Sequence, residues 1–452
     1  MHILGIDIGT TTISIVLLDE ESGALIARET VSHGAFIDDG CPVGKVQDPE
    51  KIWNIVREKC DGLIGAHGQP GCIGLTGQMH GMLYVDAGGR AVSPLYTWQD
   101  GRGNLPMDDG RSYVACLRAS GCGAAASGYG LATHFYLMKN GGVPADAAKM
   151  TTISDYIAMK LTGNAEPVLG ADMAASWGCF DLQARCFRTE AMAALGMDAQ
   201  LLPRVTTVHE VIGHTPAGVP VVVSLGDNQA SVLGSVQDLE DTVLINVGTG
   251  SQVSVGTGEY IACEGSIELR PCTGESYICV GSGLCGGRAY AMLEQFYSLA
   301  AGDGSSRYDF MLEQAEEFLE KYGYDQAWKV KTTFSGTRDN PEERGSIGGI
   351  GVENFHPGAL TVGVIAGILE ELHQAYVQIS AKTGRKPGRL VGSGNGLRRN
   401  PLMQQIAREM FGLELMIPAH QEEAAYGAAL CAMAASGRAE SLKAAQAKIT
   451  YL

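Results

Sequence analysis

The sequence is poor in positive charge, which narrows the kinds of partner that the protein can bind. It contains 33 Lys and Arg residues against 50 Asp and Glu residues, for a formal net charge of −17. Its densest basic stretch, residues 383–389, is interrupted by glycine and proline. A negative surface without a basic stripe repels nucleic acid and anionic lipid. We therefore expect neither a nucleic acid nor a membrane as partner, although backbone N–H groups and a metal ion could still bind phosphate.

Paired cysteines and long apolar runs are also missing. The 12 cysteines occur without any C-x-x-C pair, which argues against zinc and redox motifs and favours free thiols in a reducing compartment. No apolar run approaches the ~18 residues that a membrane span needs. The N-terminus lacks the basic region of a secretory signal, and Asp7 interrupts its short apolar stretch. These absences predict a cytoplasmic protein.

What is present indicates an α/β protein of two related domains. A chain of 452 residues is longer than one hydrophobic core usually serves. A strand–turn–strand pattern at residues 3–18, with Asp-Ile-Gly-Thr at its centre, recurs at residues 242–255 with Asn-Val-Gly-Thr. Strands mixed with amphipathic helices throughout favour α/β layers. Polarity rises near residues 234–241, so we expect domains at 1–236 and 237–452.

The two Gly-Thr turns are candidate phosphate-binding sites. Glycine allows a phosphate to approach the backbone, and threonine hydroxyls can donate to its oxygens. Asp7, directly before the first turn, stands where a phosphate-bound Mg²⁺ needs a carboxylate. The alternative is an ordinary hairpin with an exposed aspartate. The candidate residues for the phosphates are Gly9, Thr10, Thr11 and Thr12 in the first turn and Gly248, Thr249 and Gly250 in the second.

Asp227 is the candidate catalytic residue. It follows an apolar strand, and ligands of open α/β sheets bind at the carboxyl ends of strands. A carboxylate there could accept the proton of an attacking hydroxyl during phosphoryl transfer. The alternative is that Asp227 caps the helix that follows.

A glycine-rich turn near the end of the chain is a candidate nucleotide site. Gly392, Ser393, Gly394 and Asn395 follow a strand and precede a helix, for which Asn400 is a suitable N-cap. Such a turn can hold adenosine against bare backbone. It resembles a dinucleotide-binding fingerprint, but the glycine spacing misses G-x-G-x-x-G and too little chain follows to complete that fold.

Two further segments could bind the hydroxyls of a sugar. The first contains Gln78, Met79 and His80, although a lone histidine in a turn is often only bonded to backbone. The second, residues 97–102, combines Trp98, an amide, Asp100 and an arginine. Trp98 could stack on the C–H face of a polyol while the polar groups bind its hydroxyls. The alternative is an exposed turn with an Asp–Arg pair.

In this order, these motifs resemble the FGGY family of carbohydrate kinases, which belongs to the actin-like ATPase superfamily. The resemblance covers essentially the whole chain. It implies two actin-like (ribonuclease H-like) α/β domains with a ligand cleft between them, and ATP and Mg²⁺ as cosubstrate and cofactor. By the same resemblance, Asp227 is the catalytic base and Asp7 helps to place the metal. The residues that line the sugar site are then Gln78, Met79, His80, Asp227 and Asn228.

Within the family, several segments are similar to the kinases of a seven-carbon ketose rather than to those of ketopentoses. These segments are 97–102, 131–138, 153–156, 174–180 and 226–232. The implied reaction phosphorylates the terminal hydroxyl of sedoheptulose. Ser154 and Asn228 depart from that pattern, and Asn228 is the residue of xylulose kinases, so xylulose or another ketose or polyol remains the alternative. A non-catalytic actin-like ATPase binds no sugar, so the two candidate hydroxyl-binding segments argue against that function. A homodimer is a possible assembly.

Overall fold

A computed structural model describes residues 1–263, 265–337, 340 and 342–452. The chain forms two compact units, each described here by itself. Unit 1 comprises Met1–Gln237, Arg270–Ser276 and His420–Ile449. Unit 2 comprises Asp238–Leu269, Tyr277–Ala419 and Thr450–Leu452. Each unit therefore contains segments that are distant in the sequence, and two segments from the second half of the chain complete unit 1.

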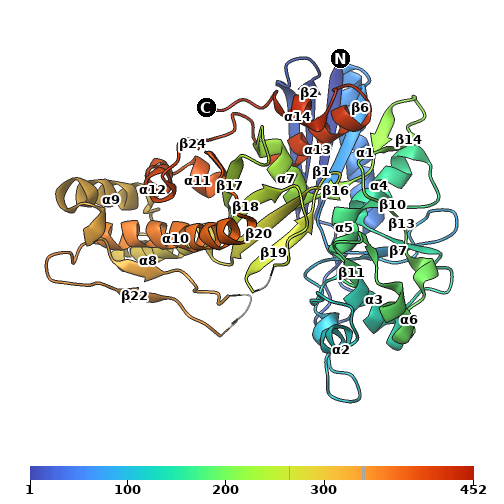
Figure 1. Cartoon of the computed structure of the whole chain (residues 1–452), viewed down its shortest axis with the longest axis horizontal. Helices are drawn as coiled ribbons and strands as arrows, with labels where there is room; N and C mark the ends of the chain where they lie inside the picture. Colours follow the sequence, from blue (N-terminus) through green and yellow to red (C-terminus); the bar gives the residue numbers. More distant parts are fainter. Residues whose placement is uncertain (264, 338–339, 341) are drawn as a thin grey trace. The chain divides into compact units, whose positions relative to one another are not determined.

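Unit 1 is built on a seven-stranded sheet in the order β14-β15-β6-β1-β2-β3, with β16 also paired to β6 (Figure 1). Its strands are β1 (His2–Ile8), β2 (Thr12–Asp19), β3 (Leu25–Ser32), β6 (Cys72–Gly77), β14 (Val211–His214), β15 (Pro220–Val222) and β16 (Leu225–Gly226). The β1–β2 hairpin is antiparallel, whereas β6 runs parallel to β1, β15 and β16. Continuous apolar runs form β1 and β6 because both faces of these strands are covered.

Helices cover this sheet, and further helices and short strands form a second hydrophobic cluster in unit 1. The helices are α1 (Pro49–His67), α2 (Tyr113–Ala119), α3 (Gly130–Lys139), α4 (Ile153–Thr162), α5 (Ala171–Ala175), α6 (Thr189–Ala194), α7 (Asp227–Ser235), α13 (Glu423–Ala435) and α14 (Leu442–Gln446). The short strands are β4 (Phe36–Ile37), β5 (Val46–Gln47), β7 (Leu83–Val85), β8 (Leu95–Tyr96), β9 (Lys149–Thr151), β10 (Val168–Gly170), β11 (Phe180–Asp181), β12 (Cys186–Phe187) and β13 (Arg204–Thr206). Trp177, fully buried, lies in the second cluster.

Unit 2 repeats the plan of unit 1 with a six-stranded sheet in the order β19-β20-β18-β17-β23-β24. Its strands are β17 (Thr242–Val247), β18 (Ser251–Thr257), β19 (Ile267–Pro271), β20 (Tyr277–Gly283), β23 (Arg389–Ser393) and β24 (Leu415–Met416), with a separate hairpin of β21 (Lys329–Lys331) and β22 (Ser346–Gly348). Its helices are α8 (Gly286–Ala301), α9 (Tyr308–Tyr322), α10 (Pro357–Thr383), α11 (Asn395–Arg398) and α12 (Pro401–Phe411). As in unit 1, an antiparallel hairpin is followed by a parallel strand. The expected repeat of the Gly-Thr hairpin is thus confirmed.

The predicted N-cap at Asn400 is also confirmed. Asn400 is the N-cap of α12, because its Oδ1 accepts a hydrogen bond from the N–H of Met403 at 2.9 Å, and Gly412 ends that helix with a φ of 64°.

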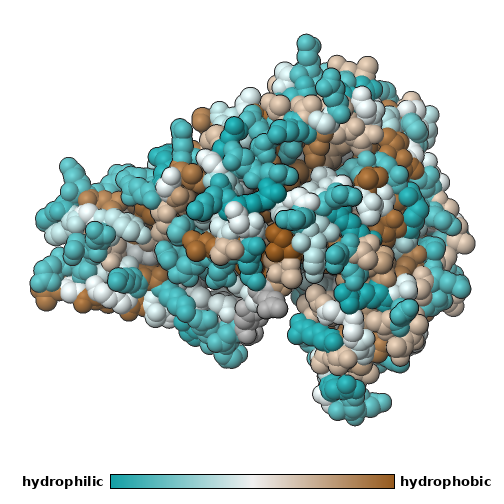
Figure 2. All heavy atoms as spheres, in the orientation of Figure 1, coloured by the Kyte–Doolittle hydropathy of each residue, from teal (hydrophilic) through white to brown (hydrophobic). Residues whose placement is uncertain are grey.

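Among the helices of the described residues, none combines the length and apolar character that crossing a bilayer requires. On the face shown in Figure 2, hydrophobic side chains lie scattered among hydrophilic ones.

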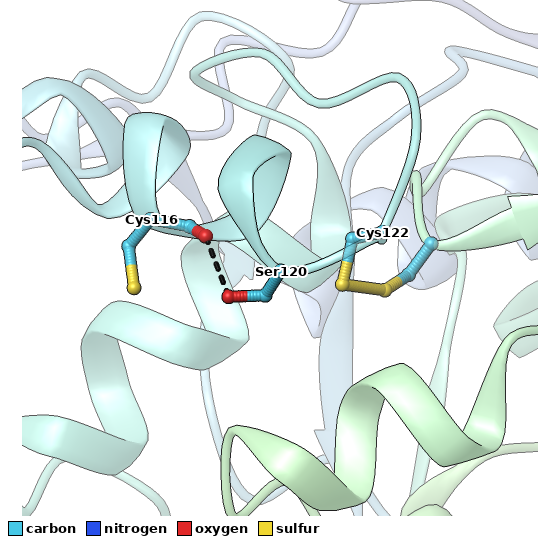
Figure 3. The surroundings of a disulfide bond; sticks show 4 residues. Cys116, Ser120 and Cys122 are labelled. Carbon is cyan, nitrogen blue, oxygen red and sulfur yellow. Dashed lines mark hydrogen bonds between the residues drawn. A yellow bond between two sulfur atoms is a disulfide. The ribbon is translucent and has the colours of Figure 1, made fainter.

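The expectation that every cysteine is a free thiol is wrong for one pair. Cys122 and Cys179 form a disulfide, while the other ten cysteines are free. The bond joins the loop after α2 to the segment that follows Trp177, as Figure 3 shows around Cys122. Spacing along the sequence did not indicate this pair because 57 residues separate its members.

Candidate active site

Three candidate segments begin at the aligned ends of neighbouring strands in unit 1. Ile8 at the end of β1 is paired with Gly77 at the end of β6, and Gly77 is also paired with Gly226 at the end of β16. The first Gly-Thr turn, the segment that starts at Gln78 and helix α7 that starts at Asp227 therefore leave one edge of the sheet together. This is the edge at which ligands bind in open α/β sheets.

Gln78 is held in place by two hydrogen bonds. Its N–H donates to the carbonyl of Ile8 at 2.9 Å, and its side-chain Nε2 donates to Oε1 of Gln47 at 3.0 Å. The side chain is 1% exposed, and its Oε1 has no protein partner. Because a buried acceptor without a partner costs about 1–3 kcal/mol, a hydroxyl donor from a ligand would be favourable at this oxygen.

His80 lies in the wall of the candidate sugar site in a left-handed conformation with a φ of 72°. Its N–H donates to Oγ of Ser176 at 2.9 Å, and its Nδ1 lies 2.7 Å from the carbonyl of Ser176. Its ring stacks on Tyr129 with 4.4 Å between the centroids. The backbone hydrogen bond that is the alternative role for this histidine thus exists at Nδ1.

Met79 packs against the start of helix α7. A Cβ placed on Gly226 would lie 2.7 Å from the sulfur of Met79, so only glycine fits there without a shift. Met79 is 6% exposed. This packing holds the strand end before Asp227 directly against the segment that carries Gln78 and His80.

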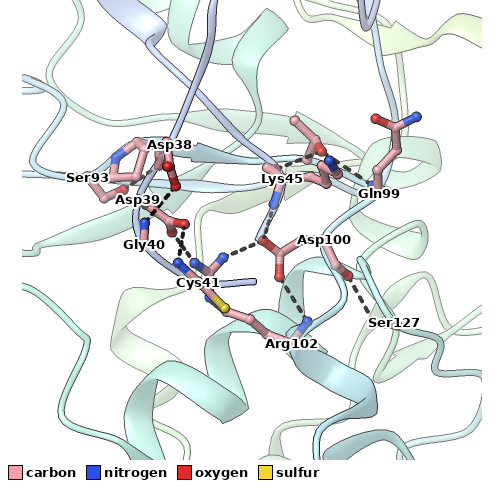
Figure 4. Close-up of polar contacts among 12 residues, drawn as sticks. Asp38, Asp39, Gly40, Cys41, Lys45, Ser93, Gln99, Asp100, Arg102 and Ser127 are labelled. Carbon is pink, nitrogen blue, oxygen red and sulfur yellow. Dashed lines mark hydrogen bonds and ion pairs between the residues drawn. The ribbon is translucent and has the colours of Figure 1, made fainter. Parts of the chain in front are cut away.

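Trp98 and Asp100 have different environments although they are close in sequence. Trp98 is 46% exposed, and its Nε1 donates to Oγ1 of Thr10 in the first Gly-Thr turn at 2.9 Å. Asp100 is 1% exposed; its carboxylate bonds Arg102 and accepts from the N–H of Lys45 at 3.1 Å. Arg102 also forms an ion pair with Asp39. Asp39, Asp100 and Arg102 together therefore hold the loop at residues 38–45 against the segment that contains Trp98 (Figure 4).

This environment argues against the expected contact of Asp100 with a sugar. The Asp–Arg pair that we considered as the alternative is present, although it is buried rather than exposed. Both carboxylate oxygens of Asp100 are already hydrogen-bonded within the protein. We therefore interpret Asp100 as an anchor for Trp98.

Asp227 lies in the first turn of helix α7, and the N-cap of this helix is Gly226. The alternative that Asp227 is the N-cap is therefore wrong. Its Oδ1 accepts from the N–H of Asn228 at 2.7 Å. Burial raises the pKa of Asp227 to about 6, while that N–H and the positive charge of Arg270 act in the opposite direction. A carboxylate with this pKa is ionised at neutral pH and is basic enough to accept a proton.

Two residues that the sequence analysis did not identify hold this part of unit 1. Asp172 in α5 accepts the N–H of Gly226 at its Oδ2, at 2.7 Å, and so fixes the turn before Asp227. Arg270, from the segment that returns to unit 1, donates from Nη1 to Oδ1 of Asn228 at 2.8 Å. Arg270 lies far from Asp227 in the sequence, and no motif marked either Asp172 or Arg270.

Asp7 occupies the end of β1 and fits the expected role toward a cation. Its Oδ1 is buried and has no hydrogen-bond partner. Burial, together with the negative charges of Asp227 and Glu422, raises the pKa of Asp7 to about 8. A divalent cation would relieve this repulsion. Among the described residues, no group of three or more His, Cys, Asp and Glu side chains could hold a metal ion. Mg²⁺ often binds through one or two carboxylates together with substrate phosphates.

In unit 2, the second Gly-Thr turn lies beside the predicted glycine-rich turn. Asn246 donates to Oγ of Ser393 at 2.8 Å. Gly394 has a φ of 83°, and a Cβ there would lie 2.6 Å from the carbonyl of Val247. Residues 248–250 and 392–395 are thus neighbours around the end of β17, as a common nucleotide site requires.

The start of helix α8 adds to this group and was not identified from the sequence. The N–H of Gly287 donates to the carbonyl of Gly248 at 2.8 Å, and the N–H of Arg288 donates to that of Thr249 at 3.0 Å. A Cβ on Gly287 would lie 2.4 Å from the carbonyl oxygen of Gly248. The amino end of a 16-residue helix therefore adjoins the turn, and such an end favours bound phosphate. The consecutive glycines Gly286 and Gly287 are the sequence feature from which this helix start could have been identified.

Comparison with known proteins agrees with this architecture. The profile of the FGGY family of carbohydrate kinases, N-terminal domain, matches residues 2–234, and that of the C-terminal domain matches residues 245–436. Sedoheptulokinases of Mus musculus and Homo sapiens are each 30% identical to this chain, over 94% of it and 96% of each relative. The crystal structure of xylulose kinase from Rhodospirillum rubrum has a TM-score of 0.85 at 21% identity and covers 100% of this chain and 93% of that chain. The expected two-domain fold is confirmed, and the chain belongs to the FGGY family of carbohydrate kinases.

Proposed function

We propose that this carbohydrate kinase transfers the γ-phosphate of ATP to the terminal hydroxyl of a ketose, with sedoheptulose as substrate and sedoheptulose 7-phosphate as product. The observation that carries the proposal is the register of β1, β6 and β16, which brings Asp7, Gln78 and Asp227 to one edge of the sheet. This edge combines a base, a buried acceptor for a hydroxyl and a turn suited to phosphate.

In the proposed reaction, Asp227 accepts the proton of the terminal hydroxyl. The hydroxyl oxygen forms a bond to the γ-phosphorus, the bond from that phosphorus to the bridging oxygen breaks, and ADP leaves. Asn228 and Gln78 orient the sugar through its hydroxyls, and Trp98 provides an apolar face. His80 and Met79 complete the wall. Because Asp227 is held by Asn228 and, through Gly226, by Asp172, the base is positioned before the substrate arrives.

We further propose that Asp7 is the protein's contribution to a Mg²⁺ site, directly or through water. When bound, Mg²⁺ neutralises charge on the β- and γ-phosphate oxygens. Backbone N–H groups and hydroxyls of Gly9, Thr10, Thr11 and Thr12 would bind phosphate in unit 1. In unit 2, nucleotide binding is assigned to the two turns and the start of α8, through Gly248, Thr249, Gly250, Gly286, Gly287, Gly392, Ser393, Gly394 and Asn395.

Support for the seven-carbon substrate comes from the relatives named sedoheptulokinase, which align along nearly the whole chain. Xylulose is the second candidate because Asn228 is the residue found in xylulose kinases, and the xylulose kinase of Escherichia coli is 26% identical over 54% of this chain. A site that hydrogen-bonds two additional hydroxyls has unpaired polar groups when they are absent, at about 1–3 kcal/mol for each group. We therefore expect kcat/KM to be about 10-fold or more higher for sedoheptulose than for xylulose.

The test is a coupled assay of ADP release over ketoses and polyols of five to seven carbons, on one preparation. A clear preference for xylulose would refute the sedoheptulose assignment and leave the kinase assignment intact. ADP release that is independent of any sugar would instead favour an actin-like ATPase that does not act on sugars. A cytoplasmic location and a homodimer stay predictions, which fractionation and light scattering can check.

A further inference from the structure

Gln47 connects the candidate sugar site to the first phosphate turn within unit 1. It lies in β5, which is paired with β8, and its side chain is fully buried. Its Nε2 donates to the carbonyl of Thr10 at 2.8 Å, and its Oε1 accepts from Nε2 of Gln78 at 3.0 Å. A single side chain therefore contacts both the turn and the wall.

The chemistry of these groups fixes the direction of the chain of hydrogen bonds. A backbone carbonyl can only accept, so the amino end of Gln47 must face Thr10 and its carbonyl end must face Gln78. Gln78 must then present its own amino end to Gln47. This leaves Oε1 of Gln78, which is buried and without a protein partner, as an acceptor for a ligand. A sugar hydroxyl that donates to this oxygen would complete the chain.

A second contact leads to the same residue of the turn. Trp98 donates from Nε1 to Oγ1 of Thr10 at 2.9 Å. Thr10 is thus bonded at its carbonyl by Gln47 and at its hydroxyl by Trp98. Movement of either wall residue on sugar binding would be transmitted to the proposed phosphate turn.

We propose that Gln47 is a positioning residue that couples occupation of the sugar site to nucleotide binding at the Gly9–Thr12 turn. The inference rests on the proposed function, because it assigns the two ends of the chain to sugar and phosphate. Bound sugar restricts the side chain of Gln78, which restricts Gln47 and, through it, the carbonyl of Thr10. The phosphate turn therefore loses less conformational entropy on binding nucleotide once the sugar is present. By linkage, bound nucleotide tightens the sugar by the same factor.

The test compares Gln47→Leu and Gln47→Glu with the wild type. Leucine removes both hydrogen bonds at similar volume. Glutamate keeps an acceptor for Gln78 but places a carboxylate oxygen against the carbonyl of Thr10, so it interrupts only one end of the chain. Gln69→Leu is the matched control, because Gln69 is exposed in the loop after α1 and is assigned no role in binding.

The readout is the dissociation constant of Mg²⁺ with a non-hydrolysable ATP analogue, measured by calorimetry with and without saturating sedoheptulose. We expect the sugar to tighten nucleotide binding to the wild type and to Gln69→Leu by the same factor. In both Gln47 variants this factor should fall about 3- to 10-fold, toward one. A residue that only supports the fold would change both dissociation constants without changing their ratio.

The outcomes separate this inference from the proposed function. If folded Gln47 variants keep the wild-type ratio, or if the wild type shows no sugar effect on the nucleotide while still releasing ADP in a sugar-dependent manner, the coupling role is refuted. Absence of sugar-dependent ADP release in the wild type would refute the proposed function itself. Should Gln47→Leu fail to fold, Gln47→Glu alone decides, and thermal denaturation of each variant checks folding.

Discussion

Replacing Asp227 with asparagine should have two opposite effects, a slower reaction and a more stable protein. Asparagine keeps the shape of the side chain and an oxygen that can accept from the N–H of Asn228, but it cannot take a proton from a hydroxyl. The loss of a general base lowers kcat by about 10²- to 10⁴-fold, while the affinities for ketose and ATP should stay close to those of the wild type.

The gain in stability follows from the pKa of Asp227, which burial raises from 3.8 to about 6. A carboxyl whose pKa is raised in the folded state binds its proton more tightly when folded, so the protein loses stability as the pH rises from about 4 to about 6. Roughly two pKa units correspond to about 3 kcal/mol, as an upper bound. Asp227→Asn should therefore be more stable than the wild type at pH 7 to 8, and the difference should vanish near pH 4.

Two measurements on the same preparations decide the matter. The first is the pH dependence of kcat/KM, which should fall tenfold per pH unit below about pH 6 in the wild type, since only ionised Asp227 acts as base. The second is thermal denaturation at pH 4 and pH 8. Asp155→Asn is a control, because burial raises the pKa of Asp155 to about 7 and this group has no assigned contact with substrate. An Asp227→Asn enzyme within tenfold of wild-type kcat would refute the assigned role.

The other predictions concern the cation, the sugar and the disulfide. Asp7→Asn should raise the Mg²⁺ concentration needed for half-maximal rate at saturating sugar, and an unchanged Mg²⁺ titration would contradict the placement of the metal. Arg270→Met should free the carboxamide of Asn228 and lower kcat/KM for the ketose about tenfold, whereas a change in the KM for ATP alone would speak against this positioning. Cys122→Ser opens a loop closed by Cys179, with a sequence separation of 57, and should lower stability by up to about 4 kcal/mol. Equal denaturation curves with and without reductant would show that the bond does not contribute.

Local patterns predicted those parts of the site that follow directly from strands. The turn after Ile8 and the candidate base Asp227 were predicted because an apolar strand ending in glycine is a local signal, and the register of the sheet brings both to one edge. The repeat of the hairpin was likewise visible because each copy is short and continuous. Residue type alone does not show that Arg102 and Lys45 already bond the carboxylate of Asp100, and the contact of Asp100 with a sugar stays a prediction.

Residues that act by positioning could not be predicted in this way. Arg270 enters unit 1 on a segment of only seven residues between two stretches of unit 2, so no local pattern relates it to Asn228. Gln47 lies in a two-residue strand, which is too short to show any periodicity. Their roles depend on contacts between distant parts of the chain.

Helix α13 shows how such distant contacts make a rigid site. Its run of small residues allows carbonyls of the helix to approach glycines of β1, β6 and α7 so closely that a Cβ on Gly5, Gly74 or Gly234 would lie 2.0 Å from a helix oxygen (Figure 1). These three elements are the ones that carry Asp7, precede Gln78 and begin at Asp227. Because a methyl group at any of the three glycines would force the helix away, α13 holds the three elements at a fixed spacing. Helix α13 therefore keeps Asp7, Gln78 and Asp227, to which the proposed function assigns the metal, a sugar hydroxyl and the base, together before any substrate binds.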